Sequence, residues 1–289
     1  MNRPATVTPI DYRPHVIGRS AKLMLPALRR FLPKRAYDRM YATLDRGYRS
    51  VRRFMCLSKV LLARLRRDHR GIARATLAHR LVPHTMGGPL ALENAFDIVW
   101  KVDAEQVPGA LVECGVAEGG TAAMMAMANL ASGAPRREKW LFDSFEGLPD
   151  PTEEDYVGDR AGLFIRPLSK GDCRGTVEQV NRLMFDLLGF RPEEVRLVKG
   201  WFQDTVPAHR DRIGPISVLR LDGDWYESTK IPLENFYDLI SPGGVVIIDD
   251  YATCYGSQRA TDEFRESRDI ASPLNPDGRG GAWFQKPTR

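Results

Sequence analysis

The sequence predicts an α/β domain built on a mostly parallel β-sheet and preceded by a basic helical arm. Two observations carry this prediction. Short apolar segments alternate with helical segments from about residue 108, and charge is divided unevenly along the 289 residues. Residues 1–80 hold 20 Lys and Arg against 4 Asp and Glu, whereas residues 81–289 hold 22 against 33. Net charges of +16 and −11 indicate two parts with different roles, an arm (1–80) and a main domain (81–289).

The arm shows apolar residues at helical spacing in 19–32 and 48–65, with Arg and Lys between them. Three interpretations stay open. The arm packs on the main domain or on a second subunit, it lies on an anionic membrane surface, or it binds nucleic acid. The first is favoured. Nucleic acid is the least favoured, because no aromatic-interleaved or zinc-finger pattern accompanies the charge.

The composition excludes several classes of protein. With 43% apolar residues the chain can bury a core, and without an apolar run of about 18 residues we expect no membrane-spanning helix. The first residues lack the basic and apolar segments of a secretory signal. The four cysteines (Cys56, Cys114, Cys173 and Cys254) have no zinc-binding spacing, so we expect reduced thiols in a cytoplasmic protein, with peripheral membrane contact left open.

The main domain alternates strands and helices. Buried apolar strands that alternate with helices are typical of a parallel sheet covered on both faces. The segment 275–281 is rich in turn formers and precedes a candidate antiparallel return strand. The predicted strands are 110–115, 139–143, 194–199, 216–222, 244–249 and 282–286, and the predicted helices are 121–130, 176–188 and 232–240.

Glycines follow the first strand, at the sheet edge where such folds bind ligands. Gly115 permits a tight turn, and Gly119 and Gly120 permit close backbone approach with free N–H groups at a helix start. The spacing matches neither the dinucleotide-binding pattern nor a P-loop. An ordinary strand–turn–helix with convenient glycines is the structural alternative.

The next two strands end in residues suited to a nucleoside. Asp143 ends the second strand, and a carboxylate accepts hydrogen bonds from both hydroxyls of a ribose, although it also serves as a helix N-cap. Trp201 follows Gly200 after the third strand. Its ring would stack on adenine, or else belong to the core or a lid.

The strongest signal is a set of four carboxylates after the fourth and fifth strands. Asp222 and Asp224 end one strand, and Asp249 and Asp250 end the other. Side chains at i and i+2 share a strand face, so we expect Asp222 and Asp224 to point into one site. Carboxylates gathered without a cation raise each other's pKa, and a hard dication such as Mg²⁺ relieves this repulsion. Solvated acids that cap helices are the alternative.

These motifs, in this order, resemble the macrocin/mycinamicin type of O-methyltransferase, which uses S-adenosylmethionine (SAM) and a metal to methylate mostly sugar hydroxyls of natural products. The resemblance covers about residues 82–289. It implies a Rossmann-like class I methyltransferase fold with a seven-stranded, mostly parallel sheet and an antiparallel C-terminal strand. Besides the motifs above it rests on 84–87 (His-Thr-Met-Gly), 107–116, 143–149 (Asp-Ser-Phe-Glu-Gly-Leu-Pro), 226–229 and 242–244.

The resemblance also implies roles for particular residues. The SAM site would be lined by Glu113, Gly115, Gly119, Asp143, Ser144, Trp201 and Asp222, with Thr85 and Met86 over the methionine end. Mg²⁺ would be held by Asp222, Asp249 and Asp250, with Asp224 as the general base. A metal beside a sugar hydroxyl lowers its pKa, and a carboxylate within reach takes the proton as the oxygen attacks the methyl group.

The chain departs from the family at Ala117-Glu118, where members often have Trp-Arg before the glycine pair. This changes the charge near the SAM carboxylate. Methylation of a catechol or phenol remains an alternative activity, as does a non-catalytic SAM-fold protein whose arm binds membrane or nucleic acid. The four retained aspartates argue against the latter. The resemblance and the arm favour a homo-oligomer acting on a small-molecule or glycan hydroxyl.

Overall fold

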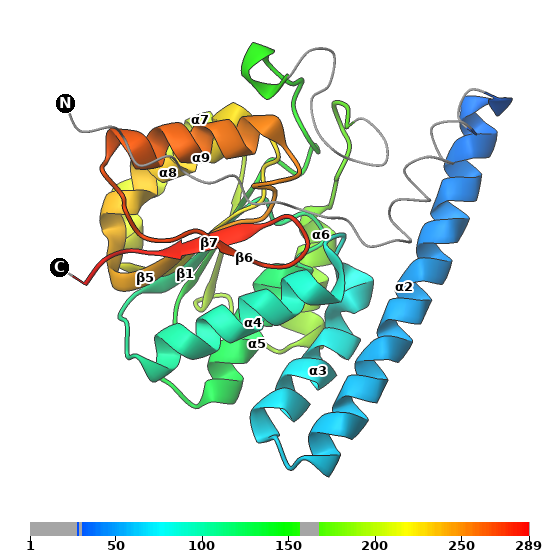
Figure 1. Ribbon diagram of the computed structural model, residues 1–289, viewed down its shortest axis with the longest axis horizontal. Helices are drawn as coiled ribbons and strands as arrows, with labels where there is room; N and C mark the ends of the chain where they lie inside the picture. The colour runs from blue at the N-terminus through cyan, green and yellow to red at the C-terminus, as the bar shows by residue number, and fades with distance from the viewer. Residues whose placement is uncertain (1–27, 29–30, 157–167, 289) are drawn as a thin grey trace.

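The computed structural model describes residue 28, residues 31–156 and residues 168–288. Within them, a seven-stranded sheet lies between two layers of helices (Figure 1). The strand order is β3-β2-β1-β4-β5-β7-β6, with the first five strands parallel and β7 antiparallel to β5 and β6. This confirms the predicted fold class. The helix expected at 19–32 lies mostly outside the described residues.

The strand predictions are confirmed to within a residue or two, except at the start of β5. That strand begins at Ile240, where Ile240 pairs with Ile216, and runs through a Ser-Pro-Gly segment that by itself indicates a break. The seventh strand is a two-residue piece inside the predicted turn region. The strands are β1 Ala110–Cys114, β2 Lys139–Asp143, β3 Val195–Lys199, β4 Ile216–Leu221, β5 Ile240–Ile248, β6 Asn275–Pro276 and β7 Ala282–Gln285.

Successive side chains of the central strands point to opposite faces of the sheet and pack into two separate hydrophobic cores. Leu111 of β1 packs on one face of the sheet, and its neighbour Val112 packs on the other, as strand alternation requires. One face is covered by α4 (Gly88–Ala104) and α5 (Gly120–Ser132), with α3 (His69–Leu81) packed on these two helices, and the other by α7 (Phe202–Ile213), α8 (Tyr226–Phe236) and α9 (Tyr255–Ser267) (Figure 1).

The helix predicted at 232–240 was placed wrongly, because α8 begins earlier and ends at Phe236, followed by a 3₁₀ turn, Tyr237–Leu239. Asp155 explains the early start, since its carboxylate accepts the Tyr226 N–H at 2.6 Å from a 3₁₀ turn, Glu153–Asp155, that is distant in the sequence. The helix predicted at 176–188 is α6 (Val177–Asn181) continued by a π-helical turn, Arg182–Leu187. Helices α3, α4, α7 and α9 were not predicted individually.

The arm contributes nearly all of α3 and one long helix, α2 (Lys34–Leu65), which lies at the outside of the molecule against α3 (Figure 1). It extends well before the predicted start at residue 48. Lys59 of α2 pairs with Glu93 of α4 at 2.6 Å, which ties the arm to the main domain. Among the described residues, no helix combines the length and the apolar character needed to cross a membrane.

Candidate active site

A cavity of about 530 Å³ opens at the carboxyl ends of β1, β2, β4 and β5. Two of the predicted site residues do not line it. Glu113 lies in β1, completely buried, and Gly119 precedes α5. The predicted residues that do line the cavity are Thr85, Met86, Gly115, Asp143, Ser144, Trp201, Asp222, Asp224, Asp249 and Asp250.

Asp143 fixes the turn that follows β1. One carboxylate oxygen accepts the N–H groups of Val116 and Ala117 at 2.7 and 2.8 Å, and the other accepts the Phe145 N–H at 2.6 Å. Neither Val116 nor Ala117 lies in a helix, so the carboxylate binds turn amides instead of capping a helix. Each carboxylate oxygen has two lone pairs, which leaves Asp143 acceptor capacity toward the cavity.

The glycines permit close approach of protein backbone to protein backbone. A Cβ on Gly115 would lie 1.9 Å from the carbonyl oxygen of Asp222, and Gly115 has a φ of +95°. A Cβ on Gly120 would lie 2.3 Å from the carbonyl oxygen of His84. The glycine turn therefore brings Asp222 and the segment that carries Thr85 and Met86 to the same cavity.

Trp201 and Ser144 lie on the wall of this cavity. Trp201 is half-buried and immediately precedes α7, so it belongs to the wall and not to either core. Ser144 accepts the Glu146 N–H at 3.1 Å and thereby orders the loop after β2. Ala117 and Glu118, the residues that depart from the family pattern, also line the cavity.

A buried arginine that the sequence reasoning missed organises the carboxylates. Arg220 of β4 is 2% exposed and pairs with Glu113 at 2.5 Å and with Asp222 at 2.9 Å. It also pairs with Oδ1 of Asp249. The available signal was a single charged residue in a predicted buried strand, Ile216–Leu221, whose other residues are apolar except for Ser217.

A second arginine, Arg279, approaches Asp249 from the turn between β6 and β7. Its guanidinium pairs with the same Oδ1 of Asp249 and with Asp277 at 3.1 Å. Asp277 accepts the N–H groups of Arg279, Gly280 and Gly281, which shapes the turn. The sequence showed these residues only as turn formers.

The carboxyl groups differ in their ionisation. Burial, together with the Asp222 carboxylate, raises the pKa of Asp224 to about 8, and burial raises the pKa of Asp250 well above its usual range. Burial also raises the pKa of Glu113 to about 8, against the opposing effect of Arg220. For Asp249 burial acts in the same direction, but Arg220 and Arg279 outweigh it and lower its pKa to about 2. Two guanidinium groups thus compensate only part of the acidic charge.

The acidic residues fit a hard dication. Asp222, Asp249 and Asp250 each offer an oxygen within 4.8 Å of the others. Within the described part of the chain, Oδ2 of Asp250 is buried and has no hydrogen-bond partner. Oxygen donors with uncompensated negative charge are the ligands that Mg²⁺ prefers.

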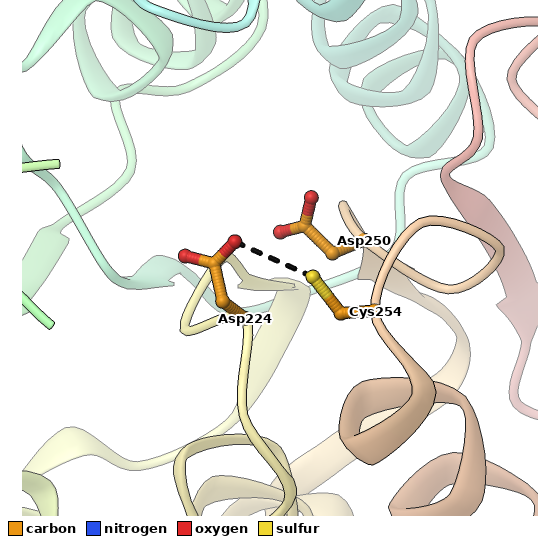
Figure 2. Close-up of side chains that lie close together, drawn as sticks. All are labelled: Asp224, Asp250 and Cys254. Carbon is orange, nitrogen blue, oxygen red and sulfur yellow. Dashed lines mark hydrogen bonds between the residues drawn. The ribbon is translucent and has the colours of Figure 1, made fainter. Parts of the chain in front are cut away.

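Asp224 belongs to a neighbouring group with Asp250 and Cys254, drawn in Figure 2. The Cys254 thiol donates a hydrogen bond to Asp224 at 3.5 Å. Asp222 and Asp224 do share one cavity, as expected, but not through strand alternation. The strand ends at Leu221, and Asp224 lies in the following loop with a φ of +61°.

Comparisons with known proteins identify the family of the chain. The family described as macrocin-O-methyltransferase (TylF) matches residues 27–286. Demethyldecarbamoylnovobiocin O-methyltransferase of Streptomyces niveus is 40% identical over 203 residues, 70% of this chain and 76% of that enzyme. Mycinamicin III 3''-O-methyltransferase of Micromonospora griseorubida is 33% identical over 71% of this chain and 79% of its own. The solved structure of the O-methyltransferase NovP, 41% identical, superposes with a TM-score of 0.62 over 71% of this chain and 82% of NovP.

The pairing of Arg220 predicts a large loss of stability when it is removed. Arg220→Met leaves several buried carboxyl groups without a counter-charge, and we expect the free energy of unfolding to fall by about 3–5 kcal/mol. Urea denaturation measures this. Arg196→Met is the control, because Arg196 pairs with Glu138 at the surface, 49% exposed, and should cost under about 1 kcal/mol. Equal losses in the two variants would contradict the role given to Arg220.

Proposed function

The chain belongs to the macrocin O-methyltransferase (TylF) family, and we propose that it methylates a hydroxyl of a sugar or glycosylated natural product, using SAM and Mg²⁺. The enzyme class follows from the family. The observation that carries the finer proposal is the grouping of Asp222, Asp224, Asp249 and Asp250 in one cavity with incomplete charge compensation. We also propose a cytoplasmic location, in keeping with four free thiols.

SAM, when bound, supplies the methyl group, and the wall of the cavity offers groups that suit its parts. Asp143 keeps one acceptor position, on Oδ1, for a ribose hydroxyl, and Trp201 presents a half-buried aromatic ring for the adenine. Thr85 and Met86 lie across the Gly120 turn, where the methionine end would fit. Gly115 keeps the turn tight enough for this arrangement.

Mg²⁺ would be held by Asp222, Asp249 and Asp250, and when bound it supplies positive charge that lowers the pKa of a neighbouring hydroxyl. The two guanidinium groups bind Oδ1 of Asp249, so the other oxygen of that carboxylate is the one to offer to a cation. Asp250 offers its unpartnered Oδ2. Arg220 and Arg279 keep Asp249 ionised and hold it in place.

Asp224 would take the proton from the substrate hydroxyl. Its carboxyl group is buried, lines the cavity and is held by the Cys254 thiol at 3.5 Å. Burial and the Asp222 carboxylate raise its pKa to about 8, which gives it the proton affinity of a general base. A nearby dication would lower that pKa again, so that Asp224 is ionised at neutral pH.

The role of Asp224 predicts the kinetics of a conservative variant. Asp224→Asn keeps the shape but removes the proton acceptor, so we expect kcat to fall by about 10²–10⁴ with little change in SAM affinity. The assay follows S-adenosylhomocysteine formation with Mg²⁺, over a panel of glycosides and a matched panel of catechols. Asp238→Asn is the control, because Asp238 pairs with Arg268 at the surface.

If only catechols are turned over, the acceptor is a phenolic hydroxyl and not a sugar hydroxyl. No turnover with any acceptor, together with salt-sensitive binding of vesicles or nucleic acid, would favour the non-catalytic alternative. Full activity in Asp224→Asn would remove Asp224 from the reaction.

We also propose that the enzyme self-associates through α2. Along one side of this helix, residues that are mostly apolar and exposed recur at alternating spacings of four and three. We call this line of residues the stripe, and its spacing is the heptad pattern of a seam between two helices. Its members are Met40, Leu44, Gly47, Val51, Phe54, Ser58, Leu61 and Leu65, all of them exposed except the half-buried Met40.

A different face of α2 contacts the rest of the same chain. Lys59 binds Glu93, and Arg53 binds His79 at 3.4 Å, so these basic side chains are directed away from the stripe. A second copy of the same helix presents the same stripe, which suits the self-complementary contact of a two-fold dimer. A membrane surface is the competing occupant, because the arm is basic.

A charged residue in the stripe should separate the copies. We expect wild-type protein to have at least the mass of a dimer by light scattering, and Leu61→Glu to shift it to a monomer, because a buried unpaired charge is costly. Arg39→Glu, exposed on the same helix but outside the stripe, should leave the mass unchanged. A monomeric wild type would contradict the proposal, and binding to anionic vesicles that Leu61→Glu abolishes would assign the stripe to a membrane.

A further inference from the structure

Cys254 lies beside two of the acidic residues because of a tight turn after β5. The backbone N–H of Cys254 bonds to the carbonyl oxygen of Asp250 at 2.9 Å, which folds the chain back at the start of α9. The thiol is 1% exposed and donates to Asp224. Figure 2 shows the sulfur and one oxygen of each carboxylate facing one another across a small space. One ligand atom from each of the three residues lies within 4.8 Å of the others.

One member of this group has a buried oxygen for which the described residues offer no hydrogen-bond partner, and it is the same oxygen that Asp250 would offer to Mg²⁺. Asp250 is 6% exposed, and its Oδ2 has no hydrogen-bond partner among the described residues. Its other oxygen accepts the Thr253 hydroxyl at 3.1 Å. An unpartnered buried carboxylate oxygen is costly, and a cation removes that cost.

The donor set differs from that of the neighbouring oxygen site. Mg²⁺ prefers six oxygen ligands in octahedral geometry and binds thiolate poorly. Zn²⁺ and Cd²⁺ accept one thiolate with two carboxylates in a four-coordinate arrangement that leaves a position for water. The thiol therefore distinguishes between two classes of metal ion that the carboxylates alone would not separate.

We propose that Asp224, Asp250 and Cys254 form a second metal site, selective for a thiophilic dication such as Zn²⁺ and distinct from the Mg²⁺ site formed by Asp222, Asp249 and Asp250. Binding forms a metal–sulfur bond and releases to solvent the thiol proton and any proton held by the two carboxyl groups, with no change of oxidation state. The two sites share Asp250, so occupation of one weakens the other.

The consequence for catalysis rests on the proposed function. A Zn²⁺ ion that holds the Asp224 carboxylate prevents it from accepting the substrate proton, and it also withdraws Asp250 from Mg²⁺. Zn²⁺ should therefore inhibit methyl transfer through the base and not through SAM. The binding of the ion itself does not depend on this role.

The test uses Cd²⁺ as a probe, because its bond to thiolate gives an ultraviolet charge-transfer band. Reduced full-length protein is titrated with Cd²⁺, and we expect one equivalent to bind with this band and to be displaced by Zn²⁺ at far lower concentrations than by Mg²⁺, which competes only through Asp250. Cys254→Ser should abolish the band. Cys173→Ser is the matched control, since Cys173 lines the same cavity, and it should keep the band.

Asp224→Asn supplies a second variant that retains the thiol. We expect it to keep the band and to lower Cd²⁺ affinity at least about tenfold, or 1.4 kcal/mol. Circular dichroism confirms that each variant is folded. A band that persists in Cys254→Ser, that disappears in Cys173→Ser, or that is absent from the wild type would overturn the site.

The same experiments distinguish a failure of the proposed function from a failure of the thiol metal site. Cd²⁺ binding with no methyl transfer from any Mg²⁺-loaded enzyme would leave the thiol site standing and remove the catalytic interpretation. If Zn²⁺ inhibits Cys254→Ser as strongly as the wild type, each measured against its own rate without Zn²⁺, then inhibition does not pass through this site.

Discussion

The buried guanidinium of Arg220 is the interaction on which both the sheet and the cavity depend. It lies in β4 and pairs with Glu113 of β1 on one side and with Asp249 after β5 on the other. Three parallel strands are thereby joined at their carboxyl ends by one charged group, beneath the cavity. A charge this deeply buried is tolerated only because several carboxylates surround it, and those carboxylates are stable only because the charge is there.

The compensation is incomplete, and the chemistry of the cavity follows from what is left. Arg220 and Arg279 lower the pKa of Asp249 to about 2, whereas burial and neighbouring carboxylates raise the pKa of Asp224 to about 8. One carboxylate is thus fixed and ionised, and another has a high proton affinity. An added dication would complete the balance of charge. Because Cys254 adds a sulfur atom beside the carboxylates, an oxygen-preferring and a thiophilic dication would bind different residues. Fold stability and proposed catalysis therefore rest on the same group of charges.

Much of this arrangement was predictable from the sequence, because it is encoded locally. Apolar strands, the glycine turn and the aspartates at strand ends each occupy a few consecutive residues, and parallel strands bring those ends together. The rest depends on partners that are distant in the chain. The start of α8 is set by Asp155, the position of Asp249 by Arg279, and the burial of Glu113 by Arg220. The alternation rule also failed at Asp224, which lies in a loop with positive φ and not in a strand.

Calorimetric titration of SAM and Mg²⁺ into wild-type protein and Asp250→Asn tests the central claim most directly. The account predicts SAM binding in the micromolar range, together with Mg²⁺ uptake that is lost in Asp250→Asn because the unpartnered carboxylate oxygen is gone. Asp238→Asn, away from the cavity, should behave as the wild type does. Mg²⁺ uptake that is unchanged in Asp250→Asn, or no SAM binding at any Mg²⁺ concentration, would contradict the assignment of this charge cluster to a cation-assisted methyl transfer.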